Sequence, residues 1–406
     1  MDNKSTLSGD RKHPRVLFVA TEDWYFCSHR LPLAEWLIEK GAGVSVATSS
    51  GTKSGIIRSA GIEHHVVRLK RASYNPLSEW NAVRDIAAVC RQVRPDILHL
   101  VGLKPILYGT IAARRTRVRS TICAISGLGS LFAPGGMSRR LLQTIVRQCY
   151  RRYVYGQPKV RVIVQNPDDR DQLVAKEMVL PTQAVIINGS GVDLQKYKYT
   201  PDPSGEPIVF THSRMLWDKG IGQLVEAARL LRQRGVACRF VLAGLPDPAN
   251  PTSIPAEQLQ RWHDEGIVEW LGKRGDIPKL LNRSHIACLP SYYGEGIPLS
   301  LIESAAAGRP IITTDMPGCR EMVSQSLNGR IVPPRKVVPL ADAIEELVGN
   351  HSLRQKMGVE SRRLAESKYG IDAVREATWQ LYQQSLSRPS SPHATRVECP
   401  AQKAAA

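Results

Sequence analysis

Short apolar runs alternate with longer amphipathic segments along most of this chain. The runs are apolar at nearly every position, which is typical of strands buried on both faces of a parallel sheet. In the first half they predict strands at 15–20, 43–48, 63–69, 96–100, 120–125, 160–164 and 183–187. The amphipathic segments between them predict helices at 29–40, 76–94, 104–115, 138–156 and 167–176. Strands that alternate with helices indicate βαβ units and therefore a parallel sheet.

The same alternation starts again after residue 207. It predicts strands at 208–212, 238–243, 268–271, 286–290, 311–314 and 330–332. Helices are expected to begin near 220, 255, 276, 298, 318 and 338, and two more are expected at 352–367 and 372–387. We therefore predict an α/β fold with two doubly wound, Rossmann-like domains that face a central crevice. Ligands of such sheets bind outside the carboxyl ends of the strands.

Stretches rich in Pro, Ser, Gly or Ala mark the expected limits of the domains. Residues 199–207 have the composition of a linker. We therefore expect an N-terminal domain at 14–198 and a C-terminal domain at 208–371. Residues 1–13 are expected to form a flexible tail and residues 388–406 a disordered one.

Charge and cysteine usage narrow the class of protein. The 406 residues carry a formal net charge of +18, which favours polyanions, anionic membrane surfaces or phosphorylated substrates as partners. Eight cysteines without a Cys-x-x-Cys pair indicate reduced thiols in a cytoplasmic protein, not a disulfide frame or a zinc site. The N-terminal stretch lacks an apolar core of signal-peptide type, and no apolar run approaches the roughly 18 residues of a membrane span.

Basic residues concentrate in one part of the chain. The segment 97–167 has twelve Lys and Arg and no Asp or Glu. In the predicted helix 138–156 the apolar positions form one stripe, and Arg140, Arg147 and Arg151 form another. Such a helix suits an interface with anionic lipid, and a core helix with a solvated basic face is the alternative. No nucleic-acid reader motif accompanies the charge, so we expect no nucleic-acid partner.

The loop and helix around Pro298 form the strongest candidate for a ligand site. Gly294 and Gly296 allow the backbone to approach a ligand closely, and a helix then begins, whose N-terminus attracts anions such as phosphate. The carboxylates of Glu295 and Glu303 can accept hydrogen bonds from sugar hydroxyls. The pattern suits a sugar nucleotide; the plain alternative is a helix-dipole role for Glu303 and a solvated Glu295.

Arg214 and Lys219 flank the turn that follows the predicted strand 208–212. A diphosphate leaving group needs positive charge as its bond to a sugar breaks, and fixed cations can supply it without a metal. Arginine offers a bidentate fork and lysine a point charge. A surface ion pair that involves Asp218 is the alternative.

The N-terminal half offers candidates for an acceptor site. His99 lies near the end of a predicted strand and is followed by Lys104, although a core histidine fits the periodicity better. Ser126 and Gly127 open the loop after another strand, where glycine permits close approach to a phosphate or sugar. A plain tight turn is equally compatible with these two residues.

The first loop, at 21–30, is expected to lie over the crevice. Its polar and aromatic residues, among them His29, could hold an acceptor. Neither half has Gly-x-Gly-x-x-Gly after its first strand, which argues against a dinucleotide-dependent dehydrogenase.

These motifs resemble glycosyltransferase family 4, whose members are retaining enzymes with the GT-B fold. The resemblance spans about residues 14–387 and rests first on GEGIPLSLIE at 294–303 and SRMLWDKG at 213–220. The N-terminal half is similar to the subgroup that builds capsule, exopolysaccharide, O-antigen and lipid-linked glycans. The matching stretches are SHRLPL (28–33), HLVGLKP (99–105), SGLG (126–129), QNPDD (165–169) and NGSGVD (188–193).

The resemblance implies a catalytic set and a donor site in the C-terminal domain. Arg214 and Lys219 would hold the donor diphosphate, and Glu295 would bind the hydroxyls of the donor sugar. Glu303 would bind the nucleotide ribose. The remaining donor-binding residues would be Gly296, Ile297, Pro298 and Leu299.

The resemblance also implies an acceptor site in the N-terminal domain, which the helix at 372–387 would complete. The acceptor-binding residues would be His29, His99, Lys104, Ser126 and Gly127. The leaving phosphate can itself take the acceptor proton in such enzymes, so no protein base is required. Neither a metal nor a cofactor is expected.

We therefore expect a retaining, metal-independent enzyme that moves a hexose or N-acetylhexosamine from a UDP-sugar. The expected acceptor is an undecaprenyl-diphosphate-linked saccharide in cell-surface polysaccharide or glycan synthesis. The expected location is the cytoplasm, with peripheral attachment to the inner face of the cytoplasmic membrane. Two alternatives stay open: a UDP-sugar epimerase of the same shape, and a non-catalytic partner that binds sugar nucleotide or membrane.

Overall fold

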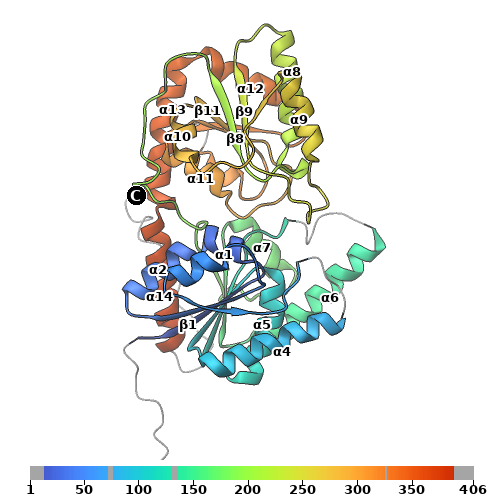
Figure 1. Cartoon of the computed structure of the whole chain (residues 1–406), viewed down its shortest axis with the longest axis vertical. Coiled ribbons are helices and arrows are strands. Elements are labelled where there is room, and N and C mark those ends of the chain that lie inside the picture. The colour runs from blue at the N-terminus through green and yellow to red at the C-terminus, as the bar shows by residue number, and fades with distance from the viewer. Residues whose placement is uncertain (1–12, 72–75, 130–135, 325–326, 388–406) are drawn as a thin grey trace, which may run out of the picture.

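The computed structural model has two α/β lobes, one above the other in Figure 1, each built around one parallel sheet. It describes residues 13–71, 76–129, 136–324 and 327–387. The expected tail 388–406, and all of the expected tail 1–13 except its last residue, therefore lie outside the described residues.

The N-terminal sheet has the strand order β3-β2-β1-β4-β5-β6-β7, with every neighbouring pair parallel. The strands are β1 (Arg15–Ala20), β2 (Gly43–Thr48), β3 (Glu63–Val66), β4 (Ile97–Val101), β5 (Ser120–Ala124), β6 (Val160–Val164) and β7 (Ala184–Ile186). The helices are α1 (Asp23–His29), α2 (Leu31–Glu39), α3 (Ser54–Ser59), α4 (Pro76–Val93), α5 (Leu103–Thr116), α6 (Met137–Tyr153) and α7 (Pro167–Ala175). The order reverses at β1, so this sheet is doubly wound, as predicted.

The C-terminal sheet has the parallel order β10-β9-β8-β11-β12-β13. Its strands are β8 (Ile208–His212), β9 (Arg239–Ala243), β10 (Glu269–Trp270), β11 (Ile286–Leu289), β12 (Ile311–Thr314) and β13 (Gly329–Val332). The helices are α8 (Ile221–Gln233), α9 (Ala256–Asp264), α10 (Ile277–Asn282), α11 (Leu299–Ala306), α12 (Val337–Gly349), α13 (His351–Leu364) and α14 (Ile371–Ser387). This sheet is doubly wound about β8 in the same way.

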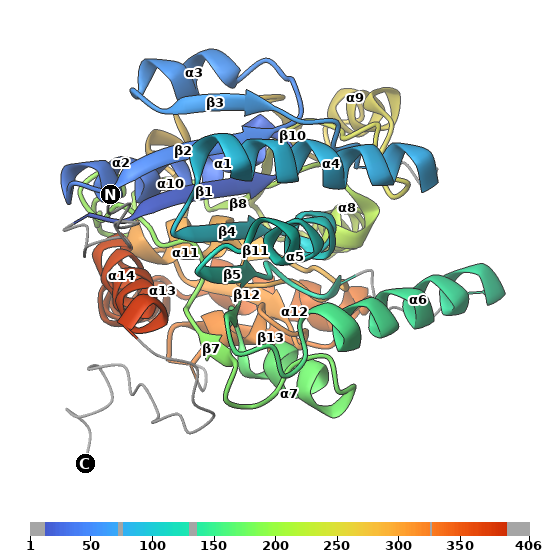
Figure 2. The same cartoon turned by 90° about the horizontal axis from the view of Figure 1, so that it is seen from below.

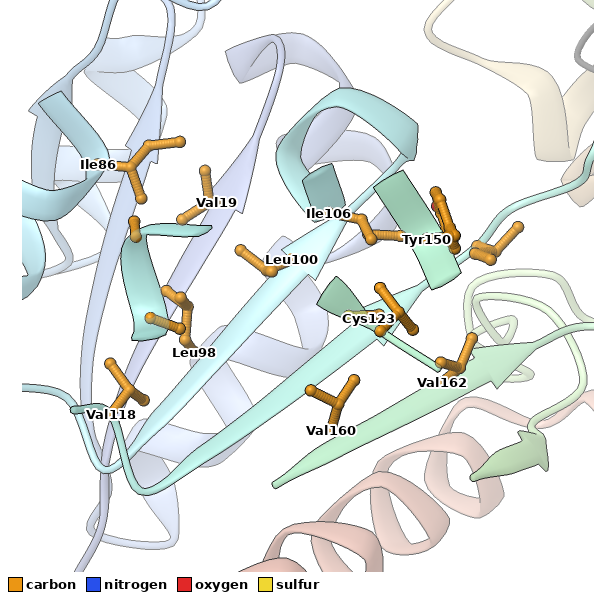
Figure 3. Packing of buried hydrophobic residues seen from close by; sticks show 14 of the residues in the cluster. Val19, Ile86, Leu98, Leu100, Ile106, Val118, Cys123, Tyr150, Val160 and Val162 are labelled. Atoms are coloured by element: carbon orange, nitrogen blue, oxygen red, sulfur yellow. The ribbon is translucent and has the colours of Figure 1, made fainter. Parts of the chain in front are cut away.

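Strand β1 illustrates how both faces of the N-terminal sheet are covered. Val16 and Phe18 belong to a cluster with residues of α1, α2 and α14, whereas Leu17 and Val19 belong to one with α4, α5 and α6. Successive side chains of a strand face opposite sides. Figure 3 shows the second cluster around Val19 and Leu100. Burial on both faces explains why the strands are uninterrupted apolar runs in the sequence.

Helix α14 returns from the C-terminal lobe to the N-terminal one. A π-helical turn at Ala365–Tyr369 follows α13, and α14 then runs beside the lower lobe in Figure 1. Its side chains Val374, Leu381 and Tyr382 are buried in the N-terminal core. Helix α14, the last one among the described residues, is thus part of the first domain.

The structure differs from the predicted elements in three places. The expected loop at 21–30 contains α1, where Asp23 in the first turn accepts a hydrogen bond from the backbone N–H of Lys53 at 2.7 Å. Helix α3 was missed because so short a segment has too few positions for a periodic signal. Near residue 318 only a 3-10 turn at Arg320–Met322 forms, because Gly318 adopts a φ of +78° and packs against the loop at Gly296.

Candidate active site

Loops that follow strands of both sheets meet between the two domains. After β5, the carbonyl oxygen of Ser126 accepts a hydrogen bond from the Gly296 N–H at 3.3 Å. After β6, Gln165 Oε1 accepts one from the Ile297 N–H at 2.7 Å. The residues of the predicted crevice therefore lie beyond the carboxyl ends of both sheets, where ligands of such folds bind.

Lys219 and Glu295 form an ion pair in this region. Lys219 Nζ lies 2.5 Å from Glu295 Oε2, and the two side chains are only 12% and 10% exposed. Gly220 permits this turn, since its φ is +74° and a Cβ would lie 2.0 Å from the carbonyl oxygen of Pro290. Glu295 Oε1 is buried and has no hydrogen-bond partner among the described residues. One carboxylate oxygen thus pairs with lysine, and the other can accept a hydrogen bond from a ligand hydroxyl.

Both oxygens of Glu303 are held by residues that the sequence analysis did not identify. The Tyr197 hydroxyl donates to Oε1 at 2.5 Å, and His212 Nε2 lies 2.7 Å from Oε2. Burial, together with the charge of Glu303, raises the pKa of the Tyr197 phenol, which therefore stays a donor at neutral pH. An ionised carboxylate has about four acceptor positions, so Glu303 can still accept hydrogen bonds from ribose hydroxyls.

Arg214 is paired with Asp247, another residue that the sequence analysis did not identify. Arg214 Nη1 lies 2.6 Å from Asp247 Oδ2. Burial opposes ionisation of Asp247, but hydrogen bonds from Arg214 and Arg71 outweigh it and hold its pKa below the usual range. Arg214 remains 38% exposed, so its guanidinium can also reach a ligand.

The backbone N–H groups of the loop are used differently from the expectation. Those of Gly296 and Ile297 donate to the N-terminal domain in this structure and so do not point at a phosphate. The N-terminus of α11 is open instead. Pro298 gives it no side-chain cap, and the N–H groups of Leu299 and Ser300 have no acceptor among the described residues. This helix end is where an anion fits best.

Three of the expected acceptor residues lie near the loop at 294–298. His29 stacks on Tyr25 with ring centroids 4.3 Å apart, and the Tyr25 hydroxyl donates to Ser126 Oγ at 2.7 Å. Burial, then the charge of Arg30, lowers the pKa of His29 to about 4. Gly127 has a φ of +109° and touches the loop from the other domain.

The other two expected acceptor residues contact other parts of the protein in this structure, and their role in acceptor binding stays a prediction. His99 is completely buried, with Nδ1 2.5 Å from the Tyr382 hydroxyl of α14. It is the core histidine that its periodicity favoured. Lys104 Nζ donates to Glu79 Oε1 at 2.9 Å and to the carbonyl oxygen of Lys70 at 2.8 Å, which ties it to α4.

The described part of the chain shows neither a metal-binding cluster nor a membrane-spanning helix. They contain no group of three or more His, Cys, Asp or Glu side chains placed to hold a metal ion. Within the same residues, no helix combines the length and the apolar character needed to cross a membrane.

Known proteins resemble this chain in both halves. A family model described as "Glycosyl transferase 4-like" matches residues 15–156, and one described as "Glycosyl transferases group 1" matches residues 195–364. N,N'-diacetylbacillosaminyl-diphospho-undecaprenol alpha-1,3-N-acetylgalactosaminyltransferase of Campylobacter jejuni is 27% identical over 339 residues, 80% of this chain and 87% of that protein.

Solved structures share the architecture. A glycosyltransferase from Rickettsia africae has a TM-score of 0.75 at 18% identity, covering 93% of this chain and 100% of that one. Alr3699/HepE of Anabaena, solved with UDP and glucose, has a TM-score of 0.73 at 17% identity, covering 91% of this chain and 100% of that one. The two facing Rossmann-like domains are therefore the GT-B fold. The chain belongs to the glycosyltransferases of the family 4 type, and it is a glycosyltransferase.

Proposed function

We propose that this glycosyltransferase moves a sugar from a UDP-sugar to a polyprenyl-diphosphate-linked saccharide, with retention of anomeric configuration and without a metal or cofactor. The transferred sugar is a hexose or N-acetylhexosamine, and the product is a cell-surface polysaccharide or glycan. The Campylobacter relative, named for a diphospho-undecaprenol acceptor, and the Anabaena structure with UDP support this choice of substrates.

The Glu295–Lys219 pair is the observation that carries the proposal. Glu295 Oε1 is a buried acceptor that no described residue partners, and it lies beside a lysine, which fits a sugar hydroxyl next to a phosphate. As the bond from the anomeric carbon to the phosphate oxygen breaks, Lys219 and Arg214 stabilise the negative charge on the leaving diphosphate. The acceptor oxygen forms the new bond on the same face, and its proton passes to the leaving phosphate oxygen.

Two further contacts support a nucleotide in this place. Two hydrogen bonds fix the Glu303 carboxylate in a position to accept hydrogen bonds from the ribose, and the open N-terminus of α11 suits a phosphate.

His29, uncharged at neutral pH because burial lowers its pKa to about 4, offers the acceptor a neutral hydrogen-bonding group. The ring stacks on Tyr25, whose hydroxyl donates to Ser126.

A membrane surface is the proposed partner of the N-terminal domain, at the inner face of the cytoplasmic membrane. Helix α6 buries Val146 and Tyr150 in the core, but it exposes Met137, Leu141 and Ile145 by 88%, 62% and 51%. These three apolar residues are spaced by four and share one side of the helix. Figure 2 shows α6 extending away from the body of the molecule.

The charge around this apolar stripe selects the kind of surface. Arg140, Arg147 and Arg151 are exposed on the same helix, and the stretch from β4 to the start of α7 carries no acidic residue. An apolar strip with flanking arginines matches the interface of an anionic lipid bilayer. Docking there would bring the protein to a lipid-linked acceptor.

A donor screen tests the proposed reaction. Purified full-length protein is incubated with UDP-, GDP- and ADP-sugars, with and without a detergent-solubilised polyprenyl-diphosphate sugar. The amount of nucleoside diphosphate released is then measured. We expect UDP release only with the lipid acceptor, loss of it in Glu295→Gln, and normal release in Glu226→Gln, an exposed position on α8. Release without acceptor would instead indicate an epimerase or hydrolase, and UDP binding without turnover a non-catalytic partner.

A further inference from the structure

One carboxylate oxygen is shared by two arginines that belong to different domains. Asp247 Oδ2 lies 2.6 Å from Nη1 of Arg214, which follows β8 in the C-terminal domain. The same oxygen lies 2.9 Å from Nη1 of Arg71, which follows β3 in the N-terminal domain. An oxygen anion is therefore bound between the two lobes by one guanidinium from each.

The exposure of these three side chains distinguishes the carboxylate from its two partners. The Asp247 side chain is only 14% exposed, whereas Arg71 and Arg214 are 33% and 38% exposed. The backbone of Asp247 is also held in place, since its N–H donates to Ser253 Oγ at 2.9 Å. Each arginine has further N–H donors besides the one that contacts Asp247, so both can bind a second anion from the solvent side.

A purely structural role explains this arrangement poorly. Ion pairs between partly exposed side chains add little to stability. The two guanidinium groups share one oxygen of Asp247, and the other nearby carboxylate among the described residues, Glu22, pairs only with Arg71, at 3.9 Å. Two arginines that converge on one oxygen anion, next to the position expected to hold a diphosphate, match a phosphate-binding site.

We propose that Arg71 is a diphosphate-binding residue that the N-terminal domain contributes to the active site. The diphosphate oxygens bind Arg71 and Arg214 together, on the solvent side of Asp247, whose carboxylate positions the two arginines. The proposal rests on the proposed function for its ligand class. The diphosphate belongs either to the nucleotide donor or to the lipid-linked acceptor.

The pair Arg68–Asp85 provides a matched control on the same segment. Arg68 Nη2 lies 2.6 Å from Asp85 Oδ1, but both residues are in the N-terminal domain and Arg68 is 62% exposed. Removing this arginine deletes one positive charge and one ion pair three positions away from Arg71 without touching the crevice. Arg68→Ala therefore reproduces the general charge effect of Arg71→Ala.

The test measures binding of inorganic pyrophosphate and of UDP to the full chain by calorimetry, and then the KM for each substrate. Arg71→Ala is expected to weaken pyrophosphate binding about tenfold, Arg71→Lys less, and Arg68→Ala less than twofold. Asp247→Asn is expected to tighten pyrophosphate binding, because it removes a negative charge beside the bound anion; a structural ion pair would not do so. UDP affinity and donor KM change if the donor diphosphate is bound, and only the acceptor KM changes if the lipid diphosphate is bound.

Several results would overturn the proposal. It is wrong if Arg71→Ala binds pyrophosphate as the unaltered chain does, if Arg68→Ala has the same effect, or if the unaltered chain binds no pyrophosphate. Failure of the proposed function appears separately, as an absence of UDP release with lipid acceptor in a protein whose pyrophosphate binding still depends on Arg71.

Discussion

Replacing Gly127 by alanine should separate the two domains at the active site. Its φ of +109° is unfavourable for any residue with a Cβ, at a cost of about 1–3 kcal/mol. The added Cβ would also lie 2.4 Å from the Gly296 backbone nitrogen and 2.8 Å from the Glu295 carbonyl carbon, closer than real Cβ contacts come. Because both clashing atoms are backbone atoms, the loop or the whole domain must move away.

The expected size of the effect follows from the contacts that this movement breaks. Three hydrogen bonds join the domains here: Ser126 to Gly296, Gln165 to Ile297, and Asn166 Nδ2 to the carbonyl oxygen of Glu295 at 3.2 Å. At about 0.5–1.5 kcal/mol each, they stabilise this arrangement of the domains by about 1.5–4.5 kcal/mol in total, or roughly 10- to 2,000-fold. We therefore expect kcat/KM for transfer to fall at least tenfold.

Gly102 provides the control. Its φ is +92°, yet a Cβ there would meet nothing within 4 Å. Gly102→Ala therefore has a similar backbone strain without the contact to the other domain. The assay compares transfer rates and thermal unfolding of both variants with those of the unaltered protein. Equal losses of transfer in Gly127→Ala and Gly102→Ala would refute the argument that the domain contact matters.

Three other changes have predictable effects. Lys219→Met leaves the Glu295 carboxylate buried and unpaired, which should lower the unfolding free energy by about 3 kcal/mol and abolish transfer. Adding Glu295→Gln should restore stability but not transfer. Unaltered thermal unfolding of the single variant would contradict the buried pair. Leu141→Glu should weaken binding to vesicles of anionic lipid at least fivefold in a flotation assay. Gln384→Glu on α14 adds the same charge and should leave this binding unchanged, so an equal loss of binding in both variants would exclude α6 as the contact. Burial lowers the pKa of His29 to about 4, below the unperturbed 6.5, so between these pH values the folded protein binds fewer protons than the unfolded chain. The protein should therefore lose stability as the pH falls from about 6.5 to 4. In chemical denaturation His29→Phe should show a smaller loss, and an identical pH dependence of the two proteins would contradict the burial.

Much of the fold is readable from the sequence, because burial on both faces leaves a simple signal. Strands such as β1, β2 and β8 have the predicted bounds, since their apolar runs have clear ends. Helix α1 was missed because its residues are polar or aromatic, and the hydrogen bonds of Asp23 to the segment at Lys53 and Ser54 are long-range contacts. Local periodicity carries no information about such contacts.

The site was readable only in part. Glu295 and Lys219 stand out because glycines and a strand end surround them, and the structure pairs them. The partners of Glu303 and Arg214 come from other loops; Tyr197, for example, is 106 positions away from Glu303. The use of loop N–H groups by Ser126 and Gln165 depends on how two domains meet, which a single-chain pattern cannot encode.

The return of α14 to the N-terminal lobe has a consequence for synthesis of the protein on the ribosome. Folding of a multidomain chain normally starts with the N-terminal domain while the rest is still being made. Here α1 and α2 cover only part of the sheet face that carries Val16 and Phe18, and the rest stays uncovered until Leu381 and Tyr382 have been translated. The first domain is thus completed last, and a chain that stops before residue 371 would expose an apolar surface suited to chaperones or proteases.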